Sequence, residues 1–542
     1  MKTILGAAIG SCVHVGGLHH FLKLAEPEGY RTSSMGPAVS IERLVGAISE
    51  KRPTIVAISY RLTPEAAGQL FNELKSALTE AGFGKQRLVF GGTPPVARIA
   101  ERSGLFEKAF DGTEPVSTIK EYLRGRKEAS EAGIYSDTLI DRISQKYPYP
   151  LIRHHFGRPT IEETLRGVEI ISEAGILDVL SIGPDQNAQE HFFHPDEMDH
   201  LQDGAGGVPV RKPGDLEAIY KSTRRGNFPL VRCYSGTRDL LKWAEMSVKT
   251  INNAWAAIPL CWYSVIDGRS TRSLSEAIKE NTEVMGWYAA RGIPVEVNES
   301  HQWSLRNAHD ALAVTMSFLA AYNAKKMGVR NYVSQYMFNN PPGTTPEMDI
   351  AKMLAKNDLI SELCDDNFSV IREVRAGLAH FSPVPTFAQG QLGASIVVSM
   401  ALKPHILHVV GFSEADHAIF PDELIHSCNI AHGVLHNTLY GMPDLTDNEI
   451  VRNRKEELKS EARILLDALG KFGKDLGDDP WSDPVTMEKA IKSGLLDAPH
   501  FQGNPHLLGN VVTNIIDGAC YAIDPSTGIK LSEPERINRT VF

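Results

Sequence analysis

The chain has few cysteines, and their spacing indicates no shared site. The six cysteines among 542 residues are scattered, with no Cys-x-x-Cys pair. Neither a disulfide framework nor a cysteine-rich metal or iron–sulfur site is therefore indicated. A reducing cytoplasm is the simplest compartment for such a chain.

Long apolar runs and blocks of basic residues are also missing. No run approaches the roughly 20 apolar residues that cross a bilayer, and the opening MKTILGAAIG continues into GSCVHVGG without a signal-peptide cleavage site. The net charge is −10, with no cluster of Lys and Arg, which argues against nucleic acid and membrane surfaces as partners. We expect a small-molecule partner, and homodimer formation is left open.

What the sequence does contain is the composition of a soluble globular protein with more than one domain. Hydrophobic residues make up 42% and charged residues 23%, and 542 residues exceed one ordinary core. We expect an α/β protein with three parts. They are a doubly wound, flavodoxin-like domain over 1–140, a (β/α)8 TIM barrel over 146–445 and a small α+β appendage over 446–542.

The first part alternates strand-length apolar runs with amphipathic stretches of helical length. The apolar runs lie at 3–9, 31–36, 54–60 and 87–91, with a weaker one at 108–111. Parallel strands joined by right-handed helical crossovers form an open sheet whose ligand crevice lies at the carboxyl ends of the strands. Unusual residues that follow these strands are therefore expected to lie together.

A second alternation begins near residue 146 and contains eight strand-like runs, most of them separated by helical ones. Eight such units are the count of a (β/α)8 barrel, which carries its sites at the carboxyl ends of the strands. The expected strands are 151–157, 179–184, 229–236, 258–264, 294–299, 331–338, 368–374 and 406–414.

Three short segments that follow strands of the first part carry residues that suit a ligand site. They are SCVHVGG, with Cys12, His14, Gly16 and Gly17, then Ser59 at the end of the third strand, and Gly91 and Gly92 after the fourth. A lone histidine in a turn is most often only a structural residue. The convergence of three segments on one sheet edge favours a ligand site instead.

These segments resemble the cobalamin-binding domain of enzymes that bind the cofactor base-off, with a protein histidine on cobalt. The family pattern is Asp-x-His-x-x-Gly after strand one, a serine ending strand three and Gly-Gly after strand four. The resemblance implies that His14 is the lower axial ligand, since imidazole suits a transition metal. It also implies that Ser59 contacts the nucleotide tail and that Gly91 and Gly92 leave room for it.

Cys12 stands where that family has its aspartate. In the family the carboxylate hydrogen-bonds the far nitrogen of the axial histidine, and such partners orient the ring and raise its basicity. A thiol is a weak replacement. We therefore expect a weaker or differently tuned cobalt–nitrogen bond, with Ser11 as another candidate partner of the histidine.

From residue 146 onward the chain resembles the catalytic (epsilon) chain of glutamate mutase, also called methylaspartate mutase. The resemblance is carried by PLVRCYSGTRDLLKWAE, GIPVEVNE, LHVVGFSEADHAIFPDELIHSCNIAHGVLH and the tail from GKDLGDDPWSDPV to DGACYAID. It implies adenosylcobalamin as the cofactor and radical isomerisation of a carbon skeleton as the activity. The cobalamin domain is a separate chain in glutamate mutase and would be fused at the N-terminus here.

The same resemblance points to residues for the substrate. The family holds a diacid with arginines at strand ends, because a guanidinium binds a carboxylate through two hydrogen bonds, and Arg153 and Arg232 lie at two such ends. A third family arginine, after strand two, and a glutamate after strand four have no counterparts, which weakens glutamate as the substrate.

Position at strand ends adds further candidates to the two arginines. They are His154, His155, Trp262, Tyr263, His301, Trp303 and Glu414, of which Tyr263, His301 and Glu414 complete the predicted catalytic set. Adjacent strand residues point to opposite faces, so His154 and His155 are not expected to share a metal.

These features favour an adenosylcobalamin-dependent mutase acting on a small carboxylate or amino-acid substrate. A corrinoid-dependent methyltransferase is the alternative, mildly favoured by the Cys12 departure. A non-catalytic cobalamin-binding or light-sensing protein is disfavoured by the barrel and by the lack of a DNA-binding stretch. A two-domain metabolic enzyme without cobalamin is the remaining alternative.

Overall fold

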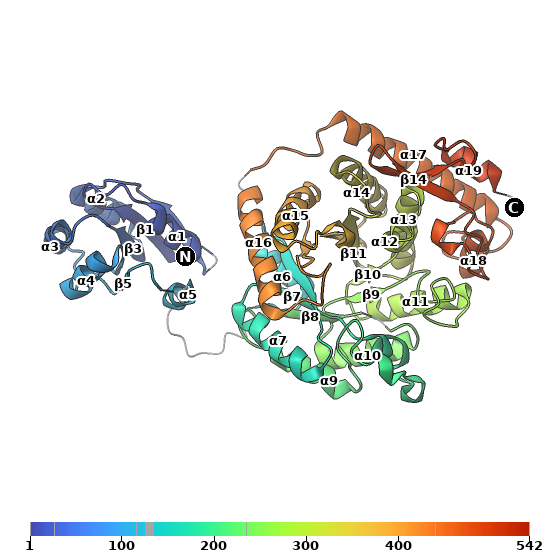
Figure 1. The fold of residues 1–542 in the computed structure, drawn as a ribbon, viewed down its shortest axis with the longest axis horizontal. Helices are drawn as coiled ribbons and strands as arrows, with labels where there is room; N and C mark the ends of the chain where they lie inside the picture. The colour runs from blue at the N-terminus through green and yellow to red at the C-terminus, as the bar shows by residue number, and fades with distance from the viewer. Residues whose placement is uncertain are drawn as a thin grey trace. The chain divides into compact units, whose positions relative to one another are not determined.

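A computed structural model of the chain describes residues 2–26, 28–114, 116–124, 135–234, 236–439 and 441–540. The chain forms two compact units, 1–130 and 131–542 (Figure 1). None of the helices in the described ranges is both long and apolar enough to cross a membrane.

The smaller unit is built on a five-stranded parallel sheet with the order β2-β1-β3-β4-β5. The strands are β1 (Lys2–Ala8), β2 (Tyr30–Ser34), β3 (Ile55–Ser59), β4 (Leu88–Gly91) and β5 (Lys108–Phe110). The helices are α1 (Gly16–Ala25), α2 (Ile41–Lys51), α3 (Pro64–Glu80), α4 (Pro94–Ser103) and α5 (Val116–Arg124). Strand order reverses between β1 and β3, and such a reversal opens a crevice at the carboxyl ends of the strands.

Helices cover both faces of this sheet. Successive strand residues face opposite sides, so Leu5 and Phe90 pack with α2, α3 and α4, whereas Ile4 and Val89 pack with α1 and α5. His14, Ser59, Gly91 and Gly92 lie at the carboxyl ends of the strands and belong to neither core, whereas Cys12 is part of the core under α2, α3 and α4.

Local capping sets where two of these helices begin. The hydroxyl oxygen of Ser40 accepts a hydrogen bond from the amide of Arg43 at the start of α2. Thr63 does the same for Ala66 at the start of α3, where a proline occupies the first turn. Both are favoured helix starts, because they satisfy amides that have no partner within the helix.

The larger unit contains a nearly closed, eight-stranded parallel barrel. Its strands are β6 (Leu151–Phe156), β7 (Val179–Ile182), β8 (Leu230–Cys233), β9 (Ala256–Ile258), β10 (Val295–Val297), β11 (Asn331–Phe338), β12 (Ser369–Ala376) and β13 (Ile406–His408). Their order is β8-β7-β6-β13-β12-β11-β10-β9, and the two end strands contact each other. A 2.9 Å hydrogen bond from Ala254 N to Val231 O joins these ends.

Helices form a ring around the barrel (Figure 1). The ring consists of α7 (Ile161–Ala174), α9 (Pro213–Ser222), α10 (Leu240–Ile251), α11 (Leu274–Ala289), α13 (Asp310–Lys326), α14 (Pro346–Ser361), α15 (Pro385–Ser399) and α16 (Pro421–Leu439). Shorter helices are α6 (Leu139–Lys146), α8 (Gln186–His191) and α12 (Ser300–Ser304).

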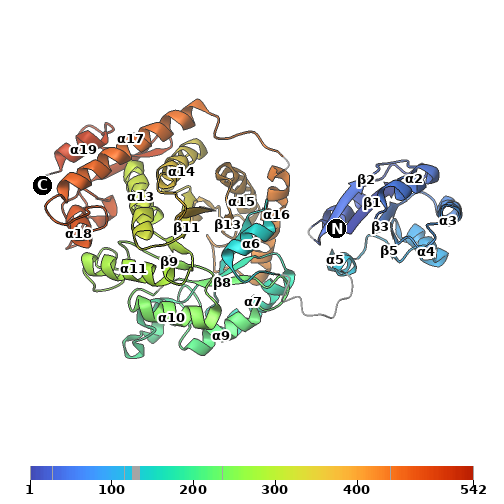
Figure 2. The ribbon, with the colours of Figure 1, turned by 180° about the vertical axis from the view of Figure 1, so that it is seen from behind.

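The C-terminal elements pack on one side of this ring (Figure 2). They are α17 (Glu449–Phe472), α18 (Pro484–Lys492), the antiparallel hairpin of β14 (Val512–Ile516) and β15 (Ala519–Ile523), and α19 (Glu533–Arg539). Helix α17 contacts α13 and α14, and α18 contacts α11.

Three layers of inward-facing side chains fill the barrel, because residues two apart on a strand share a face. The apolar layer, at the amino ends, consists of Leu151, Val179, Leu230, Val333, Ile371 and Ile406. The charged layer above it consists of Arg153, Ser181, Arg232, Glu296, Gln335, Glu373 and His408. The mouth layer, nearest the carboxyl ends, consists of His155, Tyr234, Asn298, Met337 and Arg375.

The strands expected from the sequence are present, but two differ clearly in extent. The run 406–414 was expected to be a strand, but β13 ends at His408. The run 258–264 was expected to be a strand, but β9 ends at Ile258. The amides of Leu260 and Cys261 donate to Glu299 Oε2, at 2.9 and 3.1 Å, instead of to a neighbouring strand. A buried carboxylate from the next strand end thus turns this apolar segment out of the sheet.

Candidate functional site

A largely apolar cavity of about 430 Å3 opens beside the carboxyl ends of the sheet in the smaller unit. Helix α1, the ends of β3 and β4, Phe110 of β5 and Ile119 of α5 line it. The predicted cofactor-binding residues in its wall are His14, Gly16, Gly17, Ser59, Gly91 and Gly92. The structure therefore brings these six residues together around one cavity, with Cys12 outside its wall.

His14 lies in the turn between β1 and α1, with an exposed side chain. Its Nδ1 lies 3.9 Å from Sγ of the buried Cys12. Its backbone carbonyl accepts a 3.4 Å hydrogen bond from Ser59 Oγ. The thiol thus contacts the ring and the hydroxyl holds the backbone, while Nε2 has no partner among the described residues.

The glycines around this cavity have two different structural roles. A Cβ atom added to Gly16, Gly17 or Gly91 would meet nothing within 4 Å. A Cβ added to Gly92 would lie 2.4 Å from the carbonyl oxygen of Tyr60. The first three glycines therefore leave open space at the cavity wall, and Gly92 is required for close packing of the backbone.

A second cavity, of about 750 Å3, lies at the mouth of the barrel in the larger unit. Of the predicted catalytic residues, Arg153, Tyr263 and His301 line it. Arg232 and Glu414 are not part of its wall. The structure thus brings three of the predicted residues together and leaves two outside.

Arg153 is fully buried, and each of its guanidinium nitrogens has a protein partner. Nη1 forms ion pairs with Glu373 and, at 3.6 Å, with Glu296. Nε donates to Ser181 Oγ at 2.7 Å. Nη2 donates to His155 Nε2 at 2.9 Å. Arg153 is therefore committed to the charged layer.

Arg232 is also fully buried. Its Nη2 donates to Glu296 Oε2 at 2.8 Å. The guanidinium carbon lies 5.2 Å from the Trp255 ring centroid and 5.1 Å from that of Tyr234, close enough for cation–π attraction. Arg153 and Arg232 face two buried carboxylates, Glu296 and Glu373. Burial raises the pKa of the Glu373 carboxyl more than the charge of Arg153 lowers it.

Tyr263 and His301 occupy the wall of the barrel cavity. Tyr263 has a φ of 62°, an uncommon conformation for a non-glycine residue, and its carbonyl accepts from Ser270 Oγ at 2.7 Å. The guanidinium of Arg269 lies 4.6 Å from its ring. Burial lowers the pKa of His301 to about 3, so its imidazole is neutral near pH 7.

Glu414 and the histidine pair of β6 lie around this mouth. Glu414 Oε2 accepts from the amide of Gly411 at 2.6 Å and lies 3.6 Å from His154 Nε2. His155 instead faces the interior, where the Tyr234 hydroxyl lies 2.8 Å from its Nε2. The two histidines lie on opposite faces of β6, so they do not share a site.

Sequence reasoning missed the residues that define this cavity most strongly. Four of them line its wall, Glu296, Asn298, Gln335 and Arg375, and Glu373 lies in the charged layer, paired with Arg153. The signal was present as polar side chains at every second position of apolar strands, in VEVN at 295–298 and IREVRA at 371–376. Such a period of two places charged groups inside the barrel.

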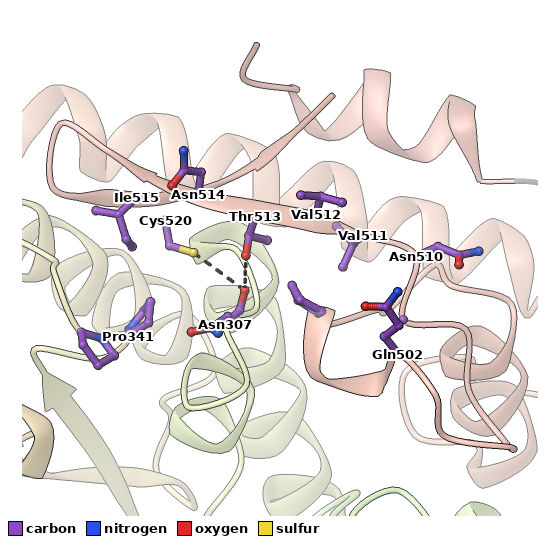
Figure 3. A pocket seen from close by; sticks show the side chains of 13 residues that line it. Asn307, Pro341, Gln502, Asn510, Val511, Val512, Thr513, Asn514, Ile515 and Cys520 are labelled. Carbon is purple, nitrogen blue, oxygen red and sulfur yellow. Dashed lines mark hydrogen bonds between the residues drawn. The ribbon is translucent and has the colours of Figure 1, made fainter. Parts of the chain in front are cut away.

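A further cavity of about 470 Å3 lies beside the β14–β15 hairpin (Figure 3). The Thr513 hydroxyl and the Cys520 thiol both donate to the carbonyl of Asn307, at 2.7 and 3.9 Å. None of the described residues in its wall is charged. It shares Pro342 with the barrel cavity, so the hairpin forms one border of the barrel mouth.

Comparisons with known proteins give only distant matches. No protein-family model and no curated protein matches the chain. A solved structure described as a novel cobalamin-binding protein from Desulfitobacterium hafniense DCB-2 is 25% identical, with a TM-score of 0.21. The match covers 23% of this chain and 58% of that one, so this chain spans less than two thirds of it.

Two other solved structures match over more of the chain. NtrX from Brucella abortus in complex with ATP is 15% identical, over 88% of this chain and 94% of that one, with a TM-score of 0.18. The cobalamin-dependent S-adenosylmethionine radical enzyme OxsB is 10% identical, over 81% and 56%, with a TM-score of 0.18. TM-scores this low do not establish a shared fold.

Proposed function

We propose that the chain is a cobalamin-dependent enzyme whose smaller unit binds the cofactor through His14. The observation that carries the proposal is a histidine at the edge of an apolar cavity whose Nε2 meets no partner in the described part of the chain, while Cys12 contacts its ring and Ser59 its backbone. A neutral imidazole with one free nitrogen is a common metal ligand. The cavity and the open space at Gly91 suit an extended, largely apolar group such as the cofactor's nucleotide base.

Cys12 takes the position of a partner for the ligating ring. Its sulfur lies within reach of Nδ1. With Nε2 bound to cobalt, the ring proton would be on Nδ1, which would then donate to the sulfur as a weak acceptor. Because a thiol polarises the ring less than a carboxylate does, His14 is a weaker donor here than in enzymes with aspartate at this position.

We further propose adenosylcobalamin as the bound form and carbon-skeleton isomerisation of a small carboxylate as the reaction. When bound, this cofactor supplies radical chemistry by homolysis of its cobalt–carbon bond. The apolar layer closes the bottom of the barrel against water. Above it, the neutral His301 and the buried Tyr263 provide hydrogen-bonding groups in the wall of the cavity.

Cofactor binding is tested with the full chain and adenosylcobalamin, by following the absorption change that accompanies replacement of the nucleotide base by a histidine. The wild type and His19→Ala are expected to show the change, because His19 is exposed and lies outside the cavity wall. His14→Ala is expected to lose it. Equal spectra and affinities in His14→Ala and the wild type would remove the basis of the proposal.

The reaction is tested by electron paramagnetic resonance after small carboxylates are added to the loaded enzyme. An organic radical signal supports the mutase. Methyl transfer from methylcobalamin in a single turnover, without such a signal, would assign a methyltransferase instead.

A further inference from the structure

Three arginines among the described residues line the barrel cavity, and they differ in their partners. Arg153 is paired with carboxylates of the charged layer. Arg269 Nε lies 3.4 Å from the buried Asp267. Arg375 forms no ion pair with any described carboxylate, and its Nε donates at 3.3 Å to the carbonyl of Ala376. The cavity wall therefore holds one uncompensated guanidinium.

The strand geometry directs Arg375 into the cavity. It lies two residues after Glu373 on β12 and so shares the inward face of that residue. Met337 and His408 are its register neighbours on β11 and β13. Arg375 and His301 both line the cavity, and after burial the charge of Arg375 is the largest cause of the low pKa of His301.

Buried acceptors without partners lie in the same wall. Asn340 is 1% exposed, and its Nδ2 donates to the carbonyl of His301 at 3.1 Å. This bond fixes the amide orientation and leaves Asn340 Oδ1 with no partner among the described residues. Asn298 Oδ1 is buried and unpartnered in the same way. Buried acceptors are normally satisfied, so a ligand donor fits this wall.

The negative charge in the wall also restricts the ligand. Glu296 lines the cavity, and Arg232 and Arg153 in the charged layer hold the pKa of its carboxyl below its usual value against the effect of burial. A second ligand carboxylate would meet this charge and acceptor oxygens, and the described cavity wall offers it no further unpaired arginine. One carboxylate and one donor group match the wall.

We propose that Arg375 is the carboxylate-binding residue of the barrel, and that the cavity accepts a small monocarboxylate carrying a hydrogen-bond donor. The inference rests on the proposed function in taking this cavity as the substrate site. In this proposal the substrate carboxylate binds Arg375 of β12. Arg153 and Arg232, the arginines indicated by the sequence, are structural members of the charged layer.

The test uses the full chain without cobalamin, so that its outcome is separate from that of the cofactor experiment. Calorimetric titration compares three four-carbon probes, γ-aminobutyrate, butyrate and succinate. The wild type is expected to bind γ-aminobutyrate most tightly and succinate most weakly. Arg375→Gln is expected to weaken γ-aminobutyrate binding by about tenfold or more, the size of one charge-assisted contact, and Arg375→Lys is expected to retain part of the affinity.

Arg330→Gln is the matched control, because Arg330 is exposed and precedes β11 at the opposite end of the barrel. It is expected to bind as the wild type does. Thermal unfolding of each variant distinguishes loss of the contact from loss of the fold. Unchanged affinity in a folded Arg375→Gln, succinate binding as tight as that of butyrate, or no binding of any probe to the wild type would each overturn the inference.

Discussion

Adjacent glycines at the end of β4 respond to substitution in opposite ways. Gly91→Val is expected to fill open space beside the cavity and weaken adenosylcobalamin binding by about tenfold or more, with stability unchanged within about 0.5 kcal/mol. Gly92→Ala places a Cβ against the carbonyl of Tyr60 and is expected to destabilise the smaller unit by about 1–3 kcal/mol. Cofactor titration and denaturant unfolding measure both effects, and undiminished binding in Gly91→Val would contradict the assignment.

Cys12, whose thiol contacts Nδ1 of His14, is expected to set the strength of the proposed cobalt–nitrogen bond. Cys12→Asp supplies a carboxylate acceptor for Nδ1 and is expected to tighten cofactor binding by roughly tenfold, the usual scale for partners of ligating histidines. Ser11→Asp adds the same charge at the neighbouring, exposed position and is the control. Equal affinity changes in both variants would show that charge alone, and not the Nδ1 contact, is responsible.

At the residue scale, the sequence indicated His14, Ser59 and the glycines because they lie within short segments at known strand ends. It indicated Arg153, which lines the barrel cavity, but not its ion-pair partner Glu373, which lies 220 positions away. Pairing over that distance depends on which strands become neighbours in the closed barrel. A single sequence contains that information only through the fold.

Helix α14 carries two buried lysines one turn apart, and only one is paired. Lys352 Nζ lies 3.1 Å from Asp310 and 3.2 Å from Asp349. Lys356 forms no ion pair within the described part of the chain, and burial together with the charge of Lys352 lowers its pKa from 10.5 to about 7. Below pH 7 the folded protein must therefore hold a buried ammonium that the unfolded chain keeps in water.

The stability of the barrel should depend on pH through this lysine. Lys356→Met is expected to raise the free energy of unfolding by roughly 2–4 kcal/mol below pH 7, and the gain should shrink as pH rises from 7 toward 10.5, where both states become neutral. Denaturant unfolding across this range measures it. Lys352→Met is the control and is expected to destabilise, because it leaves the buried Asp349 without a cation and Asp310 with Arg454 alone. A pH-independent gain in Lys356→Met would contradict the explanation.

At the element scale, apolar runs predicted the strands because their length and spacing determine what can be buried. One exception is instructive. The segment after Ile258 is as apolar as a strand, but its amides donate hydrogen bonds to Glu299 instead of to a neighbouring strand. The segment therefore leaves the sheet and runs along the barrel mouth, where Tyr263 adopts its uncommon backbone conformation. A buried carboxylate that replaces strand pairing leaves no periodic signal in the sequence.

At the scale of the whole molecule, two proposed sites lie in two separately compact units. Sites without shared partners make additive contributions. His14→Ala is therefore expected to leave γ-aminobutyrate affinity unchanged, and Arg375→Gln is expected to leave adenosylcobalamin affinity unchanged, both by calorimetric titration. A change of more than about threefold in either cross-measurement, beyond ordinary departures from additivity, would show that the sites are coupled.

The alternation of strands and helices predicted a sheet domain followed by a barrel, because each architecture has its own count and spacing of elements. Whether a predicted strand-end residue lies in a cavity or in a buried ion pair was not predictable in this way. Arg232 and Arg375 both stand at strand ends, yet one is enclosed by Glu296 and Trp255 and the other lines the cavity.

The central claim is that His14 supplies the nitrogen on cobalt. The most direct measurement is the electron paramagnetic resonance spectrum of the cob(II)alamin-loaded full chain, prepared with histidine enriched in the heavy nitrogen isotope and with unlabelled histidine. The nitrogen splitting of the cobalt signal is expected to change from three lines to two on labelling, and His14→Ala is expected to lose this change. A splitting that is the same with labelled and unlabelled histidine would show that no histidine of the chain supplies the nitrogen on cobalt.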